Sequence, residues 1–358
     1  MSEIPGHPLK GRGAQSRRQN RFDAQRHEVL QEFLQHCHEE GEALSPRTTH
    51  TRIFPKTIVN KVESPDVRMP YSMNPYQGCE HGCVYCYARN SHEFWGLGPG
   101  LDFESRILVK ETAPTLLEAF LKKPSWKASP IVLSGNTDCY QPLERELRIT
   151  RACLEVFLKY RHPVGIITKN ALVLRDLDLL QELHAHGLVA VHISLTTLNE
   201  SLRRQLEPRT ASAQRRLQTI KALLGAGIPV NAMLAPIIPG LNSAEIPALA
   251  KAAAEHGALS FGYTVVRLNG AIADLFAEWL QQTMPERSEK VLSQIRQCHG
   301  GQLRDSRFGT RIKGEGPVAE HIRQLAQVAR RRYFKGRQMP ALNCGLHAAY
   351  KSGQYSLF

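Results

Sequence analysis

The stretch GCEHGCVYCYAR, residues 78–89, places three cysteines within eight residues. Their spacing is Cys79-x3-Cys83-x2-Cys86. In a chain of 358 residues with no recognisable signal peptide, so tight a group indicates metal or redox chemistry rather than a disulfide framework. The sequence on either side of the loop has to indicate which group the loop holds.

The composition is that of a globular protein, with 42% hydrophobic and 22% charged residues, and no stretch is long and apolar enough for a membrane span. We therefore expect a cytoplasmic protein that does not act at a membrane. The net charge is +13, and basic residues gather at 10–21 and again at 302–337. Such an excess favours a polyanionic partner, nucleic acid before membrane.

Short apolar runs alternate with helical segments after the cysteine loop. The runs cover 130–135, 164–169, 188–195, 228–240 and 259–268, and the helical segments cover 147–160, 172–187, 211–227 and 243–257, with Ser243 as the expected N-cap. A first strand just before Cys79 gives about six β/α units, the pattern of a parallel sheet. Six units are too few for a closed eight-stranded barrel, so we predict a partial (β/α)6 barrel, with a doubly wound sheet as the alternative.

Four segments follow from this pattern. We expect a basic, flexible N-terminal arm over 1–50 with a short helix at 23–40, the partial barrel over 51–285, a basic helical extension over 286–350 and a tail over 351–358. The chemistry is expected at the carboxyl ends of the strands, because both sheet architectures form their sites there.

Three cysteines leave several ligand sets open. A closed zinc site needs a fourth ligand, which His81 or His92 would supply. A thioredoxin-like reading of Cys83 and Cys86 leaves Cys79 unused. A cubane iron–sulfur cluster normally takes four cysteines, so three leave one iron with an exchangeable position.

The cysteine spacing, the aromatic residues beside it and the β/α context together resemble the radical S-adenosylmethionine (SAM) superfamily over residues 70–285. The resemblance implies that Cys79, Cys83 and Cys86 hold a [4Fe–4S] cluster whose unique iron is chelated by the methionine amino and carboxylate groups of SAM. It further implies reductive cleavage of SAM to a 5′-deoxyadenosyl radical, and a low-potential electron donor such as flavodoxin or ferredoxin.

Further segments resemble the photolyase-related, spore photoproduct lyase-like branch: TDCYQPLE, SLTTLNESLRRQLEPRTAS and APIIPGLN. The arm KGRGA and the segment RFGTRIKGEGP resemble an uncharacterised bacterial subgroup of it. The resemblance implies cofactor contacts from Lys169, Ser194 and the polar turn Asn136, Thr137 and Asp138. The same turn residues also favour an Asx-turn or N-cap, and Lys169 also suits a solvated strand end.

Each of the five remaining candidates has two interpretations: Tyr85, Glu207, Arg209, Cys139 and Tyr140. Tyr85 can pack on the cofactor or in the core. Arg209 can fork onto a carboxylate, or pair with Glu207 as a surface salt bridge. The branch uses a cysteine near the end of strand two as hydrogen donor, whereas this chain reads Ser134 to Asp138 there. We therefore take Cys139, or Tyr140 beside it, as the candidate donor, with a structural turn as the alternative.

The chain ends in QYSLF, Gln354–Phe358, which is similar to the peptide by which bacterial repair proteins bind the sliding clamp. The alternative is an apolar tail that folds back on its own domain. The sequence therefore predicts a radical SAM enzyme acting on nucleic acid, for DNA repair or modification. The alternatives are the same chemistry on RNA, a protein or a small metabolite, and a non-catalytic cluster- or zinc-binding module.

Overall fold

A computed structural model describes residues 9–22, 47–67 and 69–352 of the chain. Its strands form one sheet of seven strands, in the order β10-β9-β8-β7-β6-β3-β2, and one of three, in the order β1-β5-β4. The strands are β1 (Thr49–Arg52), β2 (Val59–Lys61), β3 (Tyr71–Met73), β4 (Tyr76–Gln77), β5 (Arg106–Val109), β6 (Ile131–Leu133), β7 (Val164–Thr168), β8 (Val189–Ser194), β9 (Val230–Ile237) and β10 (Ser260–Val265).

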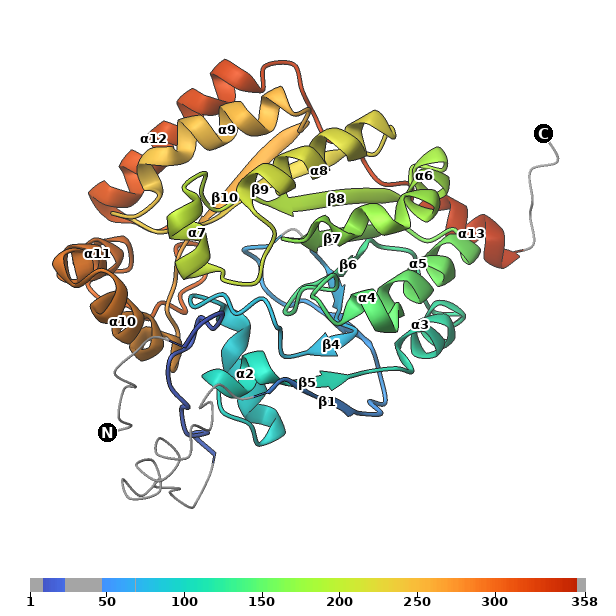
Figure 1. Ribbon diagram of the computed structural model, residues 1–358. Helices are drawn as coiled ribbons and strands as arrows, with labels where there is room; N and C mark the ends of the chain where they lie inside the picture. The colour runs from blue at the N-terminus through green and yellow to red at the C-terminus, as the bar shows by residue number, and fades with distance from the viewer. Residues whose placement is uncertain (1–8, 23–46, 68, 353–358) are drawn as a thin grey trace.

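Six strands of the larger sheet, β3 and β6 to β10, run parallel, and β2 pairs antiparallel with β3 at one edge. The strand β10 forms the other edge, and it does not pair with β2. The predicted partial (β/α)6 barrel is therefore confirmed, and the helices follow the strands along one side of the curved sheet (Figure 1). We call the end where the six parallel strands terminate the mouth.

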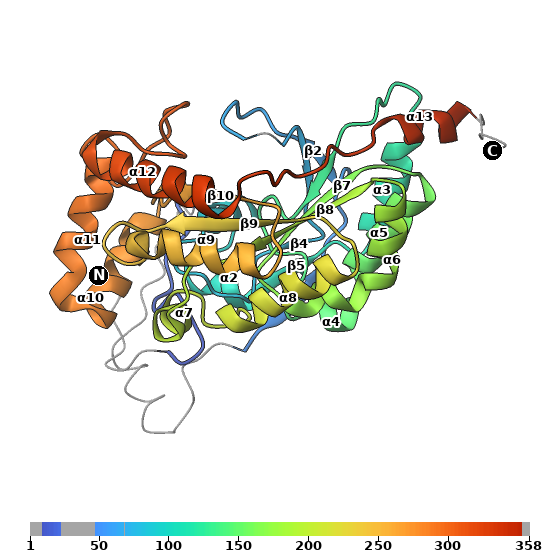
Figure 2. The same cartoon turned by 90° about the horizontal axis from the view of Figure 1, so that it is seen from above.

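The helices of the described residues are η1 (Tyr87–Trp95), α2 (Leu101–Ser105), α3 (Ala113–Leu121), α4 (Glu144–Leu147), α5 (Ile149–Lys159), η2 (Ala171–Asp176), α6 (Leu177–Ala185), α7 (Glu200–Leu206), α8 (Ala213–Gly225), η3 (Ser243–Glu245), α9 (Ile246–Glu255), α10 (Ile272–Thr283), α11 (Pro285–Cys298), α12 (Gly316–Tyr333) and α13 (Gly345–Ser352). Of these, α3, α5, α6, α8 and α9 cover the outer face of the sheet (Figure 2).

Most of these elements follow from local sequence. The strand β7 is an apolar run whose side chains are almost all buried. The side chain of Ser212 accepts the N–H of Arg215 and caps α8. Two helix starts differ from expectation, because the segment 171–176 forms a 3₁₀ turn before α6, and Ser243 begins a 3₁₀ turn rather than capping α9.

Two hydrophobic clusters hold the barrel. The larger lies between the sheet and helices such as α3, α5, α8 and α9. The second packs α10 and α11 against the cysteine loop, with Trp279 and Phe276 in contact with the group that contains Cys83 and Tyr85. The cysteine loop is therefore part of a packed core and not a loose surface loop.

The described residues nearest the two termini pack against the barrel. Residues 9–22 are packed against the barrel, with Arg12, Gln15, Ser16 and Asn20 buried, whereas their polar, basic sequence predicted a flexible arm. The helix expected at 23–40 and the tail Gln354–Phe358 lie outside the described residues. Within the described ranges, no helix has both the length and the apolarity to cross a bilayer.

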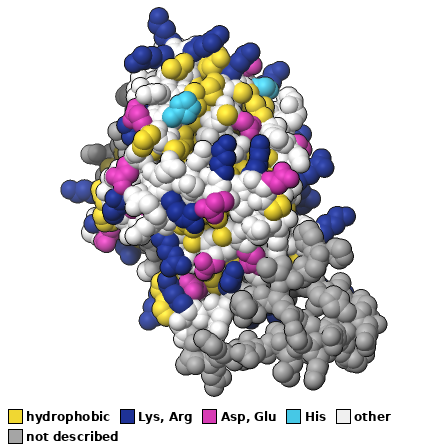
Figure 3. Space-filling model, turned by 90° about the vertical axis from the view of Figure 1, so that its left-hand side faces the viewer, with side chains coloured by type: hydrophobic (Ala, Val, Ile, Leu, Met, Phe, Trp, Pro, Cys, Tyr) yellow, Lys and Arg dark blue, Asp and Glu magenta, His cyan; other side chains and the backbone are white. Residues whose placement is uncertain are grey.

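Charge is mixed over the face that carries α10 and α11. Figure 3 shows Lys and Arg side chains interspersed with Asp and Glu there. A net charge of +13 is thus not gathered into one patch on this face, and a specific anion site has to be sought among individual residues.

Candidate active site

The cysteine loop runs from the end of β4 to the start of η1 at the mouth. Three backbone hydrogen bonds fix it: Cys79 N–H donates to Phe103 O at 2.9 Å, Val84 N–H to Leu206 O at 3.1 Å, and Arg209 N–H to His81 O at 3.3 Å. The loop is thereby joined to α2 and to the segment after α7, which holds its cysteines in one place before any ligand binds.

The three thiols are free, with Cys79 and Cys83 buried and Cys86 partly buried. Burial raises the pKa of all three, to about 12 for Cys83, and Cys79 also interacts electrostatically with Cys83 and Cys86. Soft, buried and mutually close thiols need a cation to become thiolates, so this donor set fits an iron–sulfur cluster.

The two histidines considered as fourth ligands have other neighbours. His81 Nδ1 lies 3.3 Å from a carboxylate oxygen of Asp138. His92 is buried and packs edge-on against Phe103. Across the described residues, no three or more His, Cys, Asp or Glu side chains are spaced to hold a single metal ion.

A buried ion pair supports the loop from behind. Arg89 donates to the carbonyl of Cys83 through Nε at 3.0 Å and Nη2 at 2.8 Å, and its Nη2 also contacts Glu104 at 2.5 Å. Neither side chain is exposed. Because an unpaired buried charge is costly, removal of either partner would disturb the cysteine loop directly.

Glu104 also fixes the N-terminal strap, which we define as residues 9–22. Its carboxylate accepts the N–H groups of Gly13 at 3.1 Å and Ala14 at 2.7 Å. A Cβ on Gly13 would lie 1.7 Å from the carbonyl oxygen of Gly82, inside the cysteine loop. Only glycine allows the strap to lie this close to the loop.

The polar turn after β6 is organised by Asp138. Its carboxylate accepts Thr168 Oγ1 at 2.7 Å, Lys169 N–H at 2.8 Å and Tyr140 N–H at 2.9 Å. Burial opposes its charge, but His81 and the hydrogen bonds from Lys169 N–H and Thr168 Oγ1 lower its pKa to about 2. The contact with Tyr140 is the expected Asx-turn, so Asp138 joins the ends of β6 and β7 beneath the cysteine loop.

The other turn residues are held through Asn74. Its Oδ1 accepts the N–H of Asn136 at 2.8 Å and that of Thr137 at 3.2 Å. Thr137 is buried, and its hydroxyl donates to Tyr76 O at 2.8 Å. The side chain of Asn136 is exposed, so of these two residues Asn136 is the one with a side chain available to a ligand.

Lys169 has a side chain without a hydrogen bond or ion pair to any described residue, although its backbone is held by Asp138. Burial opposes its charge, but the nearby Cys83 and Glu207 raise its pKa. An ammonium group is thus kept charged beside the cysteine loop with its donors unused.

Glu207 is fully buried and engaged. It accepts hydrogen bonds from the Tyr85 hydroxyl, from Thr196 Oγ1 at 2.7 Å and from Arg216 Nη2 at 2.5 Å. Burial opposes its charge, but Arg216 and Lys169 lower its pKa to about 2. The surface salt bridge between Glu207 and Arg209 is therefore not formed, because Arg216 takes the carboxylate.

Ser194 lies buried at the end of β8, where its carbonyl accepts Arg216 Nη1 at 3.1 Å. Cys139 and Tyr140 have no exposed surface and belong to the larger hydrophobic cluster. The Tyr140 hydroxyl donates to Asp176 at 3.0 Å. This burial favours the structural reading of Cys139 and Tyr140 over the donor reading.

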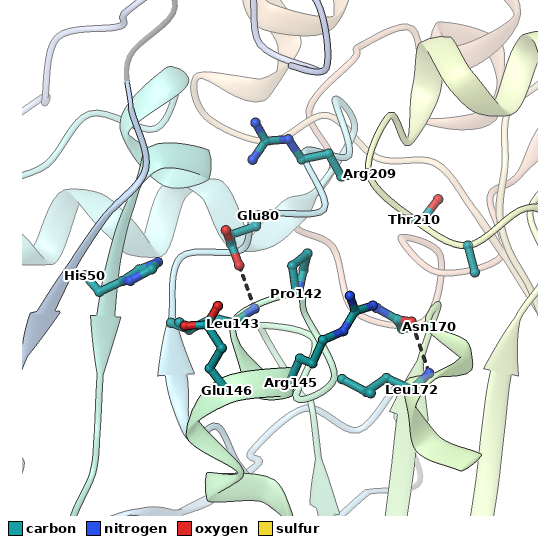
Figure 4. Close-up of a pocket in the computed structure, with 11 residues that line it drawn as sticks. His50, Glu80, Pro142, Leu143, Arg145, Glu146, Asn170, Leu172, Arg209 and Thr210 are labelled. Atoms are coloured by element: carbon teal, nitrogen blue, oxygen red, sulfur yellow. Dashed lines mark hydrogen bonds between the residues drawn. The ribbon is translucent and has the colours of Figure 1, made fainter. Parts of the chain in front are cut away.

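A cavity of about 400 Å³ lies beside the loop, and Figure 4 shows its lining. Glu80, Asn170 and Arg209 line it from three different segments, and Glu80 accepts the N–H of Leu143 at 2.8 Å. The three cysteines do not line this cavity. Arg209 thus faces a space next to the cysteine site, not the thiols themselves.

Sequence reasoning missed Arg89, Glu104 and Arg216. Each is a charge buried against an oppositely charged partner 9 or 15 residues away, and no local pattern selects that partner. Arg89 stands three residues after Cys86, but an arginine there reads equally well as a surface residue.

Comparison with known proteins adds family and fold. A family model described as the radical SAM superfamily matches residues 73–253. An uncharacterised protein of Mycobacterium tuberculosis strain H37Rv is 32% identical over 244 residues, 66% of this chain and 71% of that protein. An uncharacterised protein of Methanocaldococcus jannaschii is 30% identical over 240 residues, 67% of this chain and 85% of that one.

Solved structures of spore photoproduct lyase have the same fold. The lyase complexed with a dinucleoside spore photoproduct is 14% identical, with a TM-score of 0.59 over 80% of each chain. A variant with bound AdoMet and the same dinucleoside gives a TM-score of 0.59 at 14% identity, over 85% of this chain and 92% of that one.

Proposed function

Because the chain belongs to the radical SAM superfamily, we propose that it is an enzyme that cleaves SAM reductively and directs the resulting radical at a nucleic acid. The superfamily uses a [4Fe–4S] cluster and SAM. In this proposal Cys79, Cys83 and Cys86 bind the cluster. When bound and reduced, the cluster supplies the electron that splits SAM into methionine and a 5′-deoxyadenosyl radical.

The observation that carries the proposal is the pairing of three buried free thiols with one unpartnered ammonium. Lys169 lies within electrostatic reach of Cys83 and Cys86, and its donors make no hydrogen bond or ion pair to the described residues. A carboxylate such as that of the methionine moiety would satisfy this ammonium group. The same charge would partly offset that of three thiolates.

The neighbouring residues divide into binding and positioning groups. We assign Asn136, with Thr137 and Asp138 in the same turn, to the amino group of the cofactor, and Ser194 to its ribose. The Tyr85 hydroxyl donates a hydrogen bond to the Glu207 carboxylate, so we assign both residues a positioning role under the cysteine loop. Arg209 faces the adjacent cavity, so we assign it to neither group.

Three features support nucleic acid as the target. The net charge is +13, the fold is shared with a lyase solved with a dinucleoside photoproduct, and the tail resembles a clamp-binding peptide. The same radical chemistry on RNA, a protein or a small metabolite remains the second candidate. Electrostatic binding to nucleic acid would weaken steeply with salt, which separates the first from small-molecule substrates.

The decisive experiment is anaerobic reconstitution with iron and sulfide, followed by reduction and measurement of 5′-deoxyadenosine. We expect product from the intact protein and none from Cys79→Ala, Cys83→Ala or Cys86→Ala. Cys153→Ala is the matched control, because Cys153 is a buried core thiol away from the loop. Absence of 5′-deoxyadenosine from the intact protein under every reducing condition would overturn the enzymatic proposal in favour of a binding module.

The substrate of the radical is identified by the transfer of deuterium from substrate to 5′-deoxyadenosine. Deuterated ultraviolet-damaged DNA, intact DNA and RNA are compared as substrates, and deuterium in 5′-deoxyadenosine identifies the hydrogen source. The donor hypothesis for Cys139 or Tyr140 uses the same assay. If Cys139→Ala leaves product yield and turnover unchanged, Cys139 is not the donor.

Two partners belong to the proposal. A low-potential electron donor, flavodoxin or ferredoxin, would reduce the cluster. The sliding clamp would bind Gln354–Phe358, and capture on immobilised clamp is compared between the intact chain and one ending at residue 353. Equal capture of both would remove the clamp from the proposal.

A further inference from the structure

The segment RFGTRIK, residues 307–313, lies beside the carboxyl end of the edge strand β10, and we call it the mouth loop. Val265 N–H, at the end of β10, donates to Ile312 O at 2.9 Å. Gly309 N–H and Arg311 Nε donate to the carboxylate of Asp66 at 2.7 and 2.5 Å. Because Asp66 lies between β2 and β3, the mouth loop links the two open edges of the sheet.

Arg267, just after β10, lies beside this loop, and its guanidinium has no acceptor among the described residues. It is half-buried and makes no hydrogen bond or ion pair to the described residues. The two nearby carboxylates are taken: Asp66 by Arg311, and Asp305 by Arg307 at 3.0 Å and by His299 at 3.2 Å. Burial and the charge of Arg311 lower the pKa of Arg267, as expected of a cation that lacks its anion.

Arg267 lies close to the cysteine site. Its guanidinium carbon lies 6.0 Å from the ring centre of Tyr87, the residue after Cys86. The Tyr87 hydroxyl donates to Gly135 O at the end of β6, and the side chain is half exposed. An anion held by Arg267 would therefore lie at the rim of the mouth, one aromatic ring away from the cysteine loop.

An exposed aromatic ring lies in the same loop. Phe308 is 61% exposed, and the guanidinium of Arg311 lies 4.2 Å from its ring centre. A large apolar ring kept in solvent beside arginines is the arrangement with which proteins stack bases of single-stranded nucleic acid. An acidic peptide would use the arginine but would gain little from the ring.

We propose that Arg267 binds a backbone phosphate of a single nucleic acid strand at the mouth, and that Phe308 stacks with a base of the same strand. The planar guanidinium fork matches two phosphate oxygens. This inference rests on the proposed function, since it specifies how that substrate reaches the site. The mouth loop thereby serves both to bridge the sheet edges and to present the strand.

The test is fluorescence anisotropy of the full-length, reconstituted protein with a labelled 12-nucleotide single-stranded DNA, at several salt concentrations. We expect Arg267→Gln to weaken binding about tenfold and to reduce the salt dependence by about one phosphate contact. Phe308→Ala should weaken binding about fivefold or more without changing the salt dependence. Arg267→Lys should fall between Arg267→Gln and the intact protein, because it keeps charge and loses the fork.

The matched control is Arg215→Gln, which removes an exposed arginine from α8 on the outer layer. Equal binding by Arg267→Gln and Arg215→Gln would overturn the proposal. Competition by poly-glutamate as effective as that by the oligonucleotide, or an unaltered affinity of Phe308→Ala, would overturn the nucleic acid assignment. Substrate-free 5′-deoxyadenosine formation is measured for every variant, so a protein that cleaves SAM but binds no strand defeats this inference alone.

Discussion

His162 is a buried histidine that the fold keeps neutral. Its Nε2 accepts from Trp126 Nε1 at 3.1 Å, and its Nδ1 donates to Pro163 O at 3.0 Å. His347 of α13 packs edge-on against it, with ring centres 5.0 Å apart. Burial and the neighbouring His347 lower the pKa of His162 to about 3. Protonation would break the bond from Trp126 and place a charge in the core.

This pKa predicts acid sensitivity. The folded pKa lies below the unfolded value of about 6.5, so the unfolded chain binds the proton first, and stability is complete above pH 6.5 and is lost as pH falls toward 3. Between pH 7.5 and 5 the loss is about 2 kcal/mol. His162→Gln keeps an acceptor and a donor without titrating. Its unfolding free energy, measured in urea, should therefore vary less with pH than that of the intact protein; equal slopes would contradict the assignment.

At the scale of elements, the strap shows how a flexible-looking segment becomes ordered. Residues 10–18 are polar and basic, which predicts disorder, yet Glu104 and the carbonyl of Gly82 define a fixed path for them. Arg12 adds a hydrogen bond from Nη1 to Glu104 O at 2.9 Å. Because the same carboxylate holds Arg89, the strap and the cysteine loop share one support.

Gly13→Ala tests this support. The added Cβ would lie 1.7 Å from Gly82 O, so the strap has to lift and expose the bonds after Arg17 and Arg18. We expect trypsin to cleave there several-fold faster, and iron incorporation on reconstitution to fall. Gly225→Ala is the control, because nothing lies within 4 Å of its added Cβ. Identical cleavage rates in both variants would mean that the strap does not depend on this contact.

The extent to which sequence predicts this molecule differs by element. The strands β7 to β10 and helices α5, α8 and α9 were predictable, because each has its own apolar period and turn residues. The cysteine loop was predictable because its ligands are adjacent in sequence. The partner of Glu207 was not, since Arg216 and Arg209 both follow it closely and only packing selects between them. The strap and the mouth loop depend on contacts across more than 90 residues, which no local pattern encodes.

At the scale of the whole molecule, the C-terminal segment 302–352 contacts both ends of the open barrel. After α12 the chain runs along the end opposite the mouth, where Arg337 donates to Ala254 O at 2.7 Å and Asn343 N–H to Gly187 O at 2.8 Å. It ends at α13, on the far side of the sheet from α10 (Figure 1). The mouth loop meanwhile bridges the open edge at the other end, so one segment of about 50 residues, 302–352, stabilises both ends.

The bridge between Asp66 and Arg311 is the link in this arrangement that can be cut selectively. Both side chains are mostly buried, with 7% and 15% exposed, and the carboxylate also holds Gly309 N–H. Asp66→Ala should therefore release the mouth loop while leaving α13 in place. Hydrogen exchange measured by mass spectrometry should show faster uptake in peptides covering 307–313 and unchanged uptake in those covering 345–352. Asp66 and Arg311 share one ion pair, while Asp66 also holds Gly309 N–H and Arg311 also donates to Ser64 Oγ at 2.5 Å. Arg311→Gln should therefore also increase uptake, and the double variant should show less than the sum of the two single increases. Additive increases would show that the two residues hold the loop independently of each other.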